Sequence, residues 1–216
     1  MSKIVVFGAG GKAGRRAVAE AVSRGHQVTA VVRDPAKYED LSGEAVTVVA
    51  GDVLDADSIA KVSEGHDAAI QASFQPGLPV DEFFGGAARA LVKGLGRSGV
   101  GRLLVVGIGT ALEVSPGVAV HDTPDFPEEG RIFSLGHVAE LEALEQAETE
   151  IDWLVLAPPP AVLDNEAERP GRYTSGGRSV LPSEEGAPAF SYTDLAVALI
   201  DEIEAPKHHR ALVAVA

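Results

Sequence analysis

The stretch VFGAGGKAGRRAVAE, residues 6–20, decides the fold of this chain. It overlaps the apolar run KIVVFG (3–8) and opens the segment 12–25, whose alanines and valines recur on one helical face. A continuous apolar run that ends in glycine is typical of a strand buried on both sides. The stretch therefore predicts a strand, a glycine turn and a helix in direct succession.

The glycines of this turn have the spacing GxxGxxG, at positions 8, 11 and 14. A turn without side chains lets the backbone approach a pyrophosphate, which then lies against unpaired N–H groups at the helix N-terminus. The alternative is a tight turn with no ligand, but the motif lies at the first βα turn, where dinucleotide binding requires it. The predicted cofactor-binding residues of the loop are Gly8, Gly10, Gly11, Lys12, Ala13 and Gly14.

The apolar-strand pattern recurs along the chain, separated by helix-compatible segments. We expect strands at 3–8, 26–33, 45–52, 67–73, 101–109 and 151–158, with crossovers at 35–41, 55–64, 81–98 and 131–149. This alternation predicts an α/β fold, a doubly wound, Rossmann-like parallel sheet with helices on both faces. At 216 residues, a single domain over 1–216 is the expectation.

The pattern changes after Pro158, where the chain becomes rich in proline, glycine and polar residues. Short strand-like pieces around Tyr173 and Val180 indicate a long loop or a small hairpin. A helix at 193–206 and a closing strand, RALVAVA, follow it. We therefore expect 159–192 to form a small substrate-covering region at the carboxyl edge of the sheet.

Composition excludes several classes of function. The net charge is −14, which argues against a nucleic-acid partner, because phosphate backbones need clustered Lys and Arg. No segment approaches membrane-spanning length. The chain has no cysteine, which excludes thiolate chemistry and favours a cytoplasmic location. No ligand spacing for a metal is present, and HDTPDFPEEG (121–130) is interpreted as an exposed acidic loop.

Basic charge is nevertheless concentrated around the glycine loop. Residues 1–38 hold seven Lys and Arg but only two acids. An acidic residue at the end of the second strand binds the ribose of NAD, whereas an arginine accommodates the 2′-phosphate of NADP. This position is Arg33, 19 residues beyond Gly14 (33 − 14 = 19). The sequence therefore favours NADP over NAD, with Arg15, Lys12 and Lys37 as helpers and Asp34 as an alternative helix cap.

Other strand ends complete the predicted site, because ligands in such sheets bind outside the carboxyl ends of the strands. Asp52 and Val53 follow the third strand, either near an adenine or as a plain turn before a helix capped by Asp55. The fourth and sixth strands end in QASFQPG (71–77) and APPP (157–160). Their predicted cofactor contacts are Ala72, Ser73 and Pro158.

The motifs together resemble a known family, the atypical short-chain dehydrogenase/reductases, and within it the NAD(P)-binding, NmrA-like branch of NADH-flavin reductase type. The resemblance spans nearly the whole chain. Besides the glycine loop, it is carried by VVRDPAK (31–37), GDVLD (51–55), RLLVVGIGT (102–110), IDWLVLAPP (151–159) and YTDLAVALIDEIEAPKH (192–208).

The resemblance implies a catalytic Tyr with a Lys four residues later, and this chain lacks that pair. Ser42, Gly177 and Ala196 stand four positions after its three tyrosines. Proton transfer to a carbonyl by the usual route is therefore not expected. The residues left as catalytic candidates are Thr110, which matches a Ser or Thr after the fifth strand in similar enzymes, and His137.

Hydride transfer to a flavin asks less of the protein, since the flavin ring accepts the electrons and positioning is most of the work. We therefore expect an NADP(H)-dependent reductase of a flavin or quinone-like small-molecule acceptor. The alternative is a non-catalytic NADP(H)-sensing regulator of NmrA-like type, which the missing pair fits equally well. The sequence also leaves a homodimer open.

Overall fold

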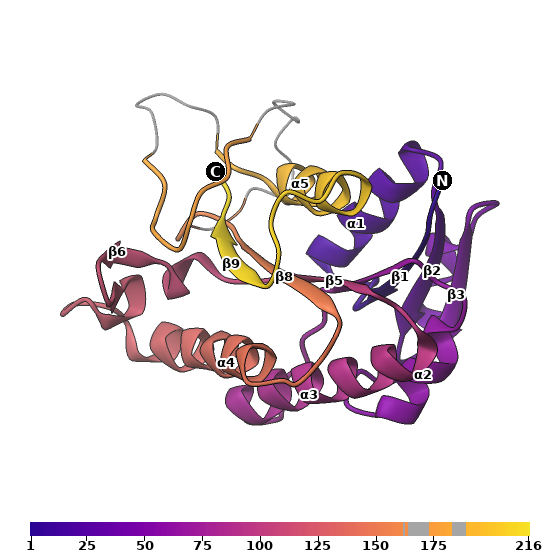
Figure 1. Ribbon diagram of the computed structural model, residues 1–216, viewed down its shortest axis with the longest axis horizontal. Coiled ribbons are helices and arrows are strands. Elements are labelled where there is room, and N and C mark those ends of the chain that lie inside the picture. Colours follow the sequence, from indigo (N-terminus) through magenta and orange to yellow (C-terminus); the bar gives the residue numbers. More distant parts are fainter. Residues whose placement is uncertain (162, 164–172, 183–188) are drawn as a thin grey trace.

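Seven parallel strands form one sheet in the order β3-β2-β1-β4-β5-β8-β9 (Figure 1). This computed structural model describes residues 1–161, 163, 173–182 and 189–216. The strands are β1 (Lys3–Phe7), β2 (Gln27–Val32), β3 (Val46–Ala50), β4 (Ala68–Gln71), β5 (Arg102–Val106), β8 (Asp152–Ala157) and β9 (Ala211–Ala214). The doubly wound, Rossmann-like fold predicted from the alternation is confirmed.

Helices cover both faces of the sheet (Figure 1). One face carries α1 (Lys12–Ser23) and α5 (Tyr192–Glu204), and the other carries α2 (Ala56–Ser63), α3 (Val80–Ser98) and α4 (Glu128–Glu145). Successive side chains of a strand point to opposite faces, so Ile4 and Val6 pack toward the first pair of helices while Val5 and Phe7 pack toward the other three. The strands are therefore apolar throughout, as a sheet covered on both faces requires.

The order of the strands reverses between β1 and β4. The chain runs outward from β1 to β3, then returns to place β4 on the other side of β1. Phe7 and Gln71 are register partners at the carboxyl ends of these two strands. A reversal of this kind opens a crevice beyond the strand ends, where open α/β sheets bind their ligands.

Some expected elements differ in the structure. The crossover predicted at 35–41 consists of two 3-10 turns, Pro35–Lys37 and Glu39–Leu41, because a proline and a short span leave no room for a regular helix. The small hairpin of β6 (Glu113–Ser115) and β7 (Val118–Ala119) was not predicted. Around Tyr173 and Val180, the described residues 173–182 form isolated bridges, Ser175 to Val215 and Glu113 to Ser179, and no regular strand.

The interpretation of 121–130 as an exposed acidic loop is wrong in part. His121 is buried and donates from Nδ1 to the Thr110 carbonyl at 2.8 Å. Arg131 forms an ion pair with Asp122 at 2.8 Å, and α4 begins three residues before the expected 131. Much of the predicted covering region, 162, 164–172 and 183–188, lies outside the described residues.

Candidate functional site

The glycine loop is shaped by the protein's own backbone at two of its positions. Gly8 has φ +76°, a left-handed conformation that favours glycine, and a Cβ there would lie 2.5 Å from the Cα of Ser73. A Cβ at Gly14 would lie 2.2 Å from the Gly8 carbonyl oxygen. These two glycines therefore let β1, β4 and the start of α1 come together at the crevice.

Gly11 has a different environment, and the space around it shows whether a pyrophosphate fits against the loop. It is the N-cap of α1, with no side chain capping the helix. A Cβ at this position would meet no protein atom closer than 3.4 Å. Packing alone does not demand glycine here, and the first N–H groups of the helix are free to bind an anion. The loop thus fits the phosphates of a dinucleotide.

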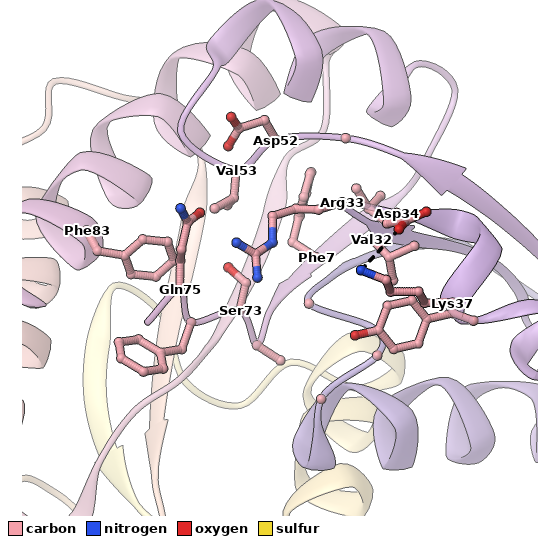
Figure 2. Close-up of a pocket in the computed structure, with 18 residues that line it drawn as sticks. Phe7, Val32, Arg33, Asp34, Lys37, Asp52, Val53, Ser73, Gln75 and Phe83 are labelled. Carbon is pink, nitrogen blue, oxygen red and sulfur yellow. Dashed lines mark ion pairs between the residues drawn. The ribbon is translucent and has the colours of Figure 1, made fainter. Parts of the chain in front are cut away.

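A first cavity of about 530 Å³ lies on the β2 and β3 side of this loop. Eight of the twelve predicted cofactor residues line it, namely Gly8, Gly10, Gly11, Arg33, Asp52, Val53, Ala72 and Ser73. Figure 2 shows the Arg33 side chain extending into the cavity toward Ser73. Among the described residues the Arg33 guanidinium has no hydrogen bond or ion pair, so its donors are available to a ligand.

Two of the predicted helpers of Arg33 have partners of their own. Arg15 donates to Asp40 at 2.6 Å and to the Gly10 carbonyl at 3.2 Å. This hydrogen bond from Arg15 holds the pKa of Asp40 below its ordinary value. Lys37 pairs with Asp34 at 3.3 Å, as the dashed line in Figure 2 marks. The structure thus shows no capping hydrogen bond from Asp34.

Of the two alternatives for the segment after the third strand, the structure shows the turn and the helix capped by Asp55, and the adenine contact stays a prediction. Asp52 and Val53 line the first cavity, while Asp55 caps α2 by accepting from the backbone N–H of Asp57 at 2.9 Å. The Asp52 carboxylate accepts from the backbone N–H of Leu54 at 2.9 Å, which fixes the turn.

A second cavity of about 800 Å³ continues from the first toward β5 and β8. The two share Gly11, Ala72, Ser73 and Phe74. Lys12, Ala13, Thr110, His137 and Pro158 also line the second cavity, so it collects the remaining predicted residues apart from Gly14. Gly14 lines neither cavity and lies buried in α1, where it packs against Gly8.

Aromatic side chains wall the second cavity on the α3 and α4 side. Phe74, Phe84, Phe133 and His137 all line it. The Phe74 and Phe84 rings stack with centroids 5.7 Å apart, and the His137 ring lies 3.9 Å from Phe84. Phe74 is 42% exposed, which is unusual for so large an apolar side chain. This wall offers flat apolar surface to a planar ligand.

Thr110 lies in a 3-10 turn just beyond β5, with its hydroxyl 2.5 Å from that of Ser134. Ser134 is fully buried and donates to the Gly130 carbonyl at 2.8 Å. Because the Ser134 proton is used in that bond, the Thr110 hydroxyl is the donor to Ser134. Thr110 is therefore fixed in orientation and keeps lone pairs to accept a hydrogen bond from a ligand.

His137 projects from α4 with its ring against Phe84. Its Nδ1 lies 3.2 Å from Oε2 of Glu140, one helical turn further on. Nε2 has no hydrogen-bond partner among the residues that the structure describes. The structure thus places His137 in the lining of the second cavity, and its catalytic role stays a prediction.

The tyrosines occupy separate environments. Tyr173 lies away from both cavities and donates to Asp201 at 2.9 Å. Burial and the Asp201 carboxylate raise the pKa of its phenol above the ordinary value, so it stays protonated. Tyr38 lines the first cavity, and Tyr192 lines the second with the Lys12 ammonium 6.0 Å from its ring centroid.

Several cavity residues were not predicted from the sequence. Gln71 is almost fully buried, lines the second cavity and accepts from the Ser73 hydroxyl at 2.8 Å. A polar residue that ends an apolar strand was the available signal for it. The aromatic residues gave no such signal, because Phe74, Phe84 and Phe133 come from three separate segments.

The sequence profile of the NAD(P)H-binding family matches residues 8–206. The chain belongs to this NAD(P)H-binding family. The matched residues include the glycine loop and the segments after the strands that line the two cavities. A nicotinamide dinucleotide is therefore the cofactor. The resemblance to the atypical short-chain dehydrogenase/reductases, inferred from the motifs, is confirmed by the same match and by the fold.

Several known proteins are similar to this chain over nearly its whole length. The protein YwnB of Bacillus subtilis (strain 168) is 35% identical over 210 residues, which are 95% of this chain and 94% of that protein. A Burkholderia pseudomallei structure, provisionally named an exported protein, is 34% identical, with TM-score 0.86 and full coverage of both chains. A Streptococcus pneumoniae TIGR4 structure, provisionally named an NADH-flavin reductase, is 28% identical, with TM-score 0.83 and coverage of 100% and 99%.

We also searched the described residues of this NAD(P)H-binding chain for a metal site and for a membrane-spanning helix. Within 1–161, 163, 173–182 and 189–216, no three His, Cys, Asp or Glu side chains gather as a metal ion would need. Of the helices in the described part of the chain, none is long and apolar enough to cross a membrane.

Proposed function

We propose that the protein is an NADP(H)-dependent reductase that transfers hydride to a flavin or quinone-like acceptor. Family membership and a reductase-named neighbour of the same fold make it an NAD(P)H-dependent oxidoreductase. The observation that carries the finer proposal is the continuity of the two cavities. One end presents the unpartnered Arg33, and the other is walled by stacked aromatic rings.

The preference for NADP rests on Arg33. Its guanidinium projects into the first cavity from the end of β2, where a 2′-phosphate lies in this fold (Figure 2). Asp34, the nearest acidic residue that could bind ribose hydroxyls instead, is paired with Lys37. An arginine with all its donors free supports charge-assisted hydrogen bonds to a phosphate.

The acceptor class rests on the second cavity. A cavity of about 800 Å³ is of the size that small-molecule sites have, and its wall of Phe74, Phe84 and Phe133 suits a flat conjugated ring. Such rings accept two electrons without help from a Tyr-Lys pair, which this chain lacks. The acceptor proposed here is therefore a small planar molecule and not a saturated alcohol or sugar.

The roles of the protein's residues follow from their placement. When bound, NADPH supplies the hydride. The loop at Gly11 holds the phosphates, and Pro158 covers the inner end of the cofactor. Thr110, fixed by Ser134, accepts a hydrogen bond from the nicotinamide amide or the acceptor. His137 delivers the proton that accompanies reduction.

Calorimetric titration with NADPH and NADH tests the cofactor preference. We expect wild type to bind NADPH more tightly, and Arg33→Ala to lose that preference by roughly tenfold or more, because hydrogen bonds to charged groups are worth about 1.5–3 kcal/mol. Arg97→Ala is the matched control, since Arg97 pairs with Asp57 on the surface, outside both cavities. Equal wild-type affinities for the two cofactors would contradict the preference.

Absorbance at 340 nm tests the reaction with FMN, FAD, riboflavin and a soluble quinone such as menadione. NADPH oxidation that depends on at least one of these acceptors is the expected result. Tight NADPH binding with no turnover on any of them would overturn the reductase proposal and favour the dinucleotide-sensing regulator.

A further inference from the structure

Glu140 is a buried carboxylate whose partners do not account for its burial. It lies on α4 at 2% exposure, where charged groups are rare unless paired. Oε2 contacts His137 Nδ1 at 3.2 Å, while Oε1 is buried with no hydrogen-bond partner among the described residues. No Lys or Arg of those residues forms an ion pair with it. Burial with one oxygen unsatisfied destabilises the folded chain, so packing alone gives no reason for a glutamate here.

The contact with His137 has a definite chemical consequence. A carboxylate oxygen only accepts, so Nδ1 of His137 carries the proton in this bond. Which nitrogen of an imidazole is protonated is set by the hydrogen bond that the other makes. With Nδ1–H held by Glu140 and the ring held against Phe84, Nε2 is the nitrogen left without a protein partner at the second cavity.

We propose that Glu140 is a positioning residue that fixes the tautomer and the ring orientation of His137, so that Nε2 faces the acceptor. This inference rests on the proposed function and deepens it. In the balanced step, a quinone or flavin gains the hydride of NADPH and one proton from Nε2 of the His137 imidazolium. NADP⁺ and the reduced acceptor result. The imidazole is left neutral with its proton on Nδ1, and solvent restores the proton to Nε2.

The pairing has the geometry of a carboxylate behind a catalytic histidine, which holds the imidazole in one tautomer and one orientation. The other ionisable groups that line the second cavity are Lys12 and Tyr192, on the α1 and α5 side. Neither forms a hydrogen bond with His137, so Glu140 is the group that determines how its imidazole is presented.

Nitrogen NMR of the histidine side chains in the free protein tests the positioning directly. The His137 signals are identified by their loss in His137→Gln. We expect an Nδ1–H tautomer in wild type and a reduced Nδ1–H share in Glu140→Met, which removes the acceptor at similar size. Glu140→Gln keeps an acceptor oxygen and should retain the tautomer. Glu142→Gln, an exposed position on the same helix, is the matched control and should match wild type.

Steady-state kinetics with NADPH and menadione or FMN supply the second measurement. We expect kcat to fall roughly a hundredfold in His137→Gln and roughly tenfold in Glu140→Met, with the KM for NADPH unchanged. Glu140→Gln should retain more turnover than Glu140→Met. The unfolding midpoint of Glu140→Met should not fall, whereas a purely structural glutamate would lower it.

The outcomes separate the two proposals. A wild type that reduces no acceptor overturns the proposed function, and the proton delivery with it. An unchanged His137 tautomer in Glu140→Met, or an unchanged kcat in an enzyme that does turn over, overturns the role of Glu140 alone.

Discussion

At the scale of single residues, the glycines of the first loop are required for two different reasons. Gly8 and Gly14 are required by the protein itself, since a Cβ would strike Ser73 at one and the Gly8 carbonyl at the other. Gly11 has no such clash, and its space opens toward both cavities. Stability and cofactor binding can therefore be separated within one motif.

Gly11→Ala is expected to fold normally and to bind NADPH at least tenfold more weakly. The backbone of Gly11 has φ −78°, which alanine adopts without strain, but the added methyl group occupies the space where the phosphates approach. Gly96→Ala is the control, because that glycine is exposed on α3 with no atom within 4 Å of a Cβ. Calorimetry with NADPH and urea unfolding measure the two effects. Undiminished NADPH affinity in Gly11→Ala would contradict the phosphate role.

At the scale of elements, the start of α5 sets one wall of the second cavity. Ser191 accepts from the backbone N–H of Asp194 at 3.1 Å, and the Asp194 carboxylate accepts from the backbone N–H of Ser191 at 3.0 Å. This capping box fixes the first turn of the helix, from which Tyr192 and Leu195 reach the cavity. The cap is thus expected to affect both stability and the shape of the site.

Ser191→Ala should lower the free energy of unfolding by about 1 kcal/mol, the usual effect of losing an N-cap hydroxyl. Urea denaturation measures it. Ser23→Ala serves for comparison, because the Ser23 hydroxyl donates back to the Glu20 carbonyl within α1 and caps no helix start. We expect it to change the free energy of unfolding by no more than about 0.5 kcal/mol. Equal destabilisation by the two substitutions would contradict the capping argument.

Local pattern predicted the elements that depend on it and missed those that depend on tertiary contacts. Apolar runs and the glycine spacing located β1, α1 and β2, because burial on both faces leaves a strong local signal. The crossover expected at 35–41 consists of two 3-10 turns and not of a regular helix, because a local pattern does not show how short the span after Pro35 is. The hairpin of β6 and β7 has only a few residues and little periodicity.

The residues of the candidate site also divide into those that a local pattern predicts and those that depend on tertiary contacts. Strand-end positions such as Arg33, Ser73 and Thr110 could be placed in advance, because parallel strands bring their carboxyl ends to one edge. The aromatic wall and Glu140 could not, since they depend on how α3 packs against α4. No local pattern marks a buried glutamate as the partner of a histidine one turn away.

At the scale of the whole molecule, a cluster of polar side chains links several elements at the edge of the sheet that lies opposite the cavities. Arg102, at the start of β5, contacts Asp152 at 2.7 Å and Glu202 at 3.0 Å. Glu202 accepts from the backbone N–H of Lys207 at 3.0 Å and lies 2.7 Å from Nδ1 of His208. Strand β5 and the segment that leads into β9 both contact this carboxylate of helix α5, which is 4% exposed, and β8 joins the cluster through the pair of Asp152 with Arg102.

This cluster makes part of the stability depend on pH. Burial alone would raise the pKa of Glu202, but the hydrogen bonds from His208 and from the backbone N–H groups of Lys207 and His208 outweigh it, so the pKa is lowered. A carboxyl whose pKa is lower in the folded state binds fewer protons there than in the unfolded chain. Its contribution is therefore complete above the ordinary glutamate pKa of about 4.3, and it is lost as pH falls through the lowered value.

Glu202→Gln should destabilise the protein at neutral pH by roughly 3 kcal/mol, because it leaves the buried Arg102 with Asp152 as its remaining ion-pair partner. The same substitution should flatten the loss of stability below about pH 4.3, since no carboxyl remains at this position to take up a proton. Urea unfolding between pH 3 and 7 measures both effects, with the exposed Glu142→Gln as control. If Glu202→Gln keeps the wild-type slope in acid, other carboxylates carry the pH dependence and the cluster does not join the elements as argued.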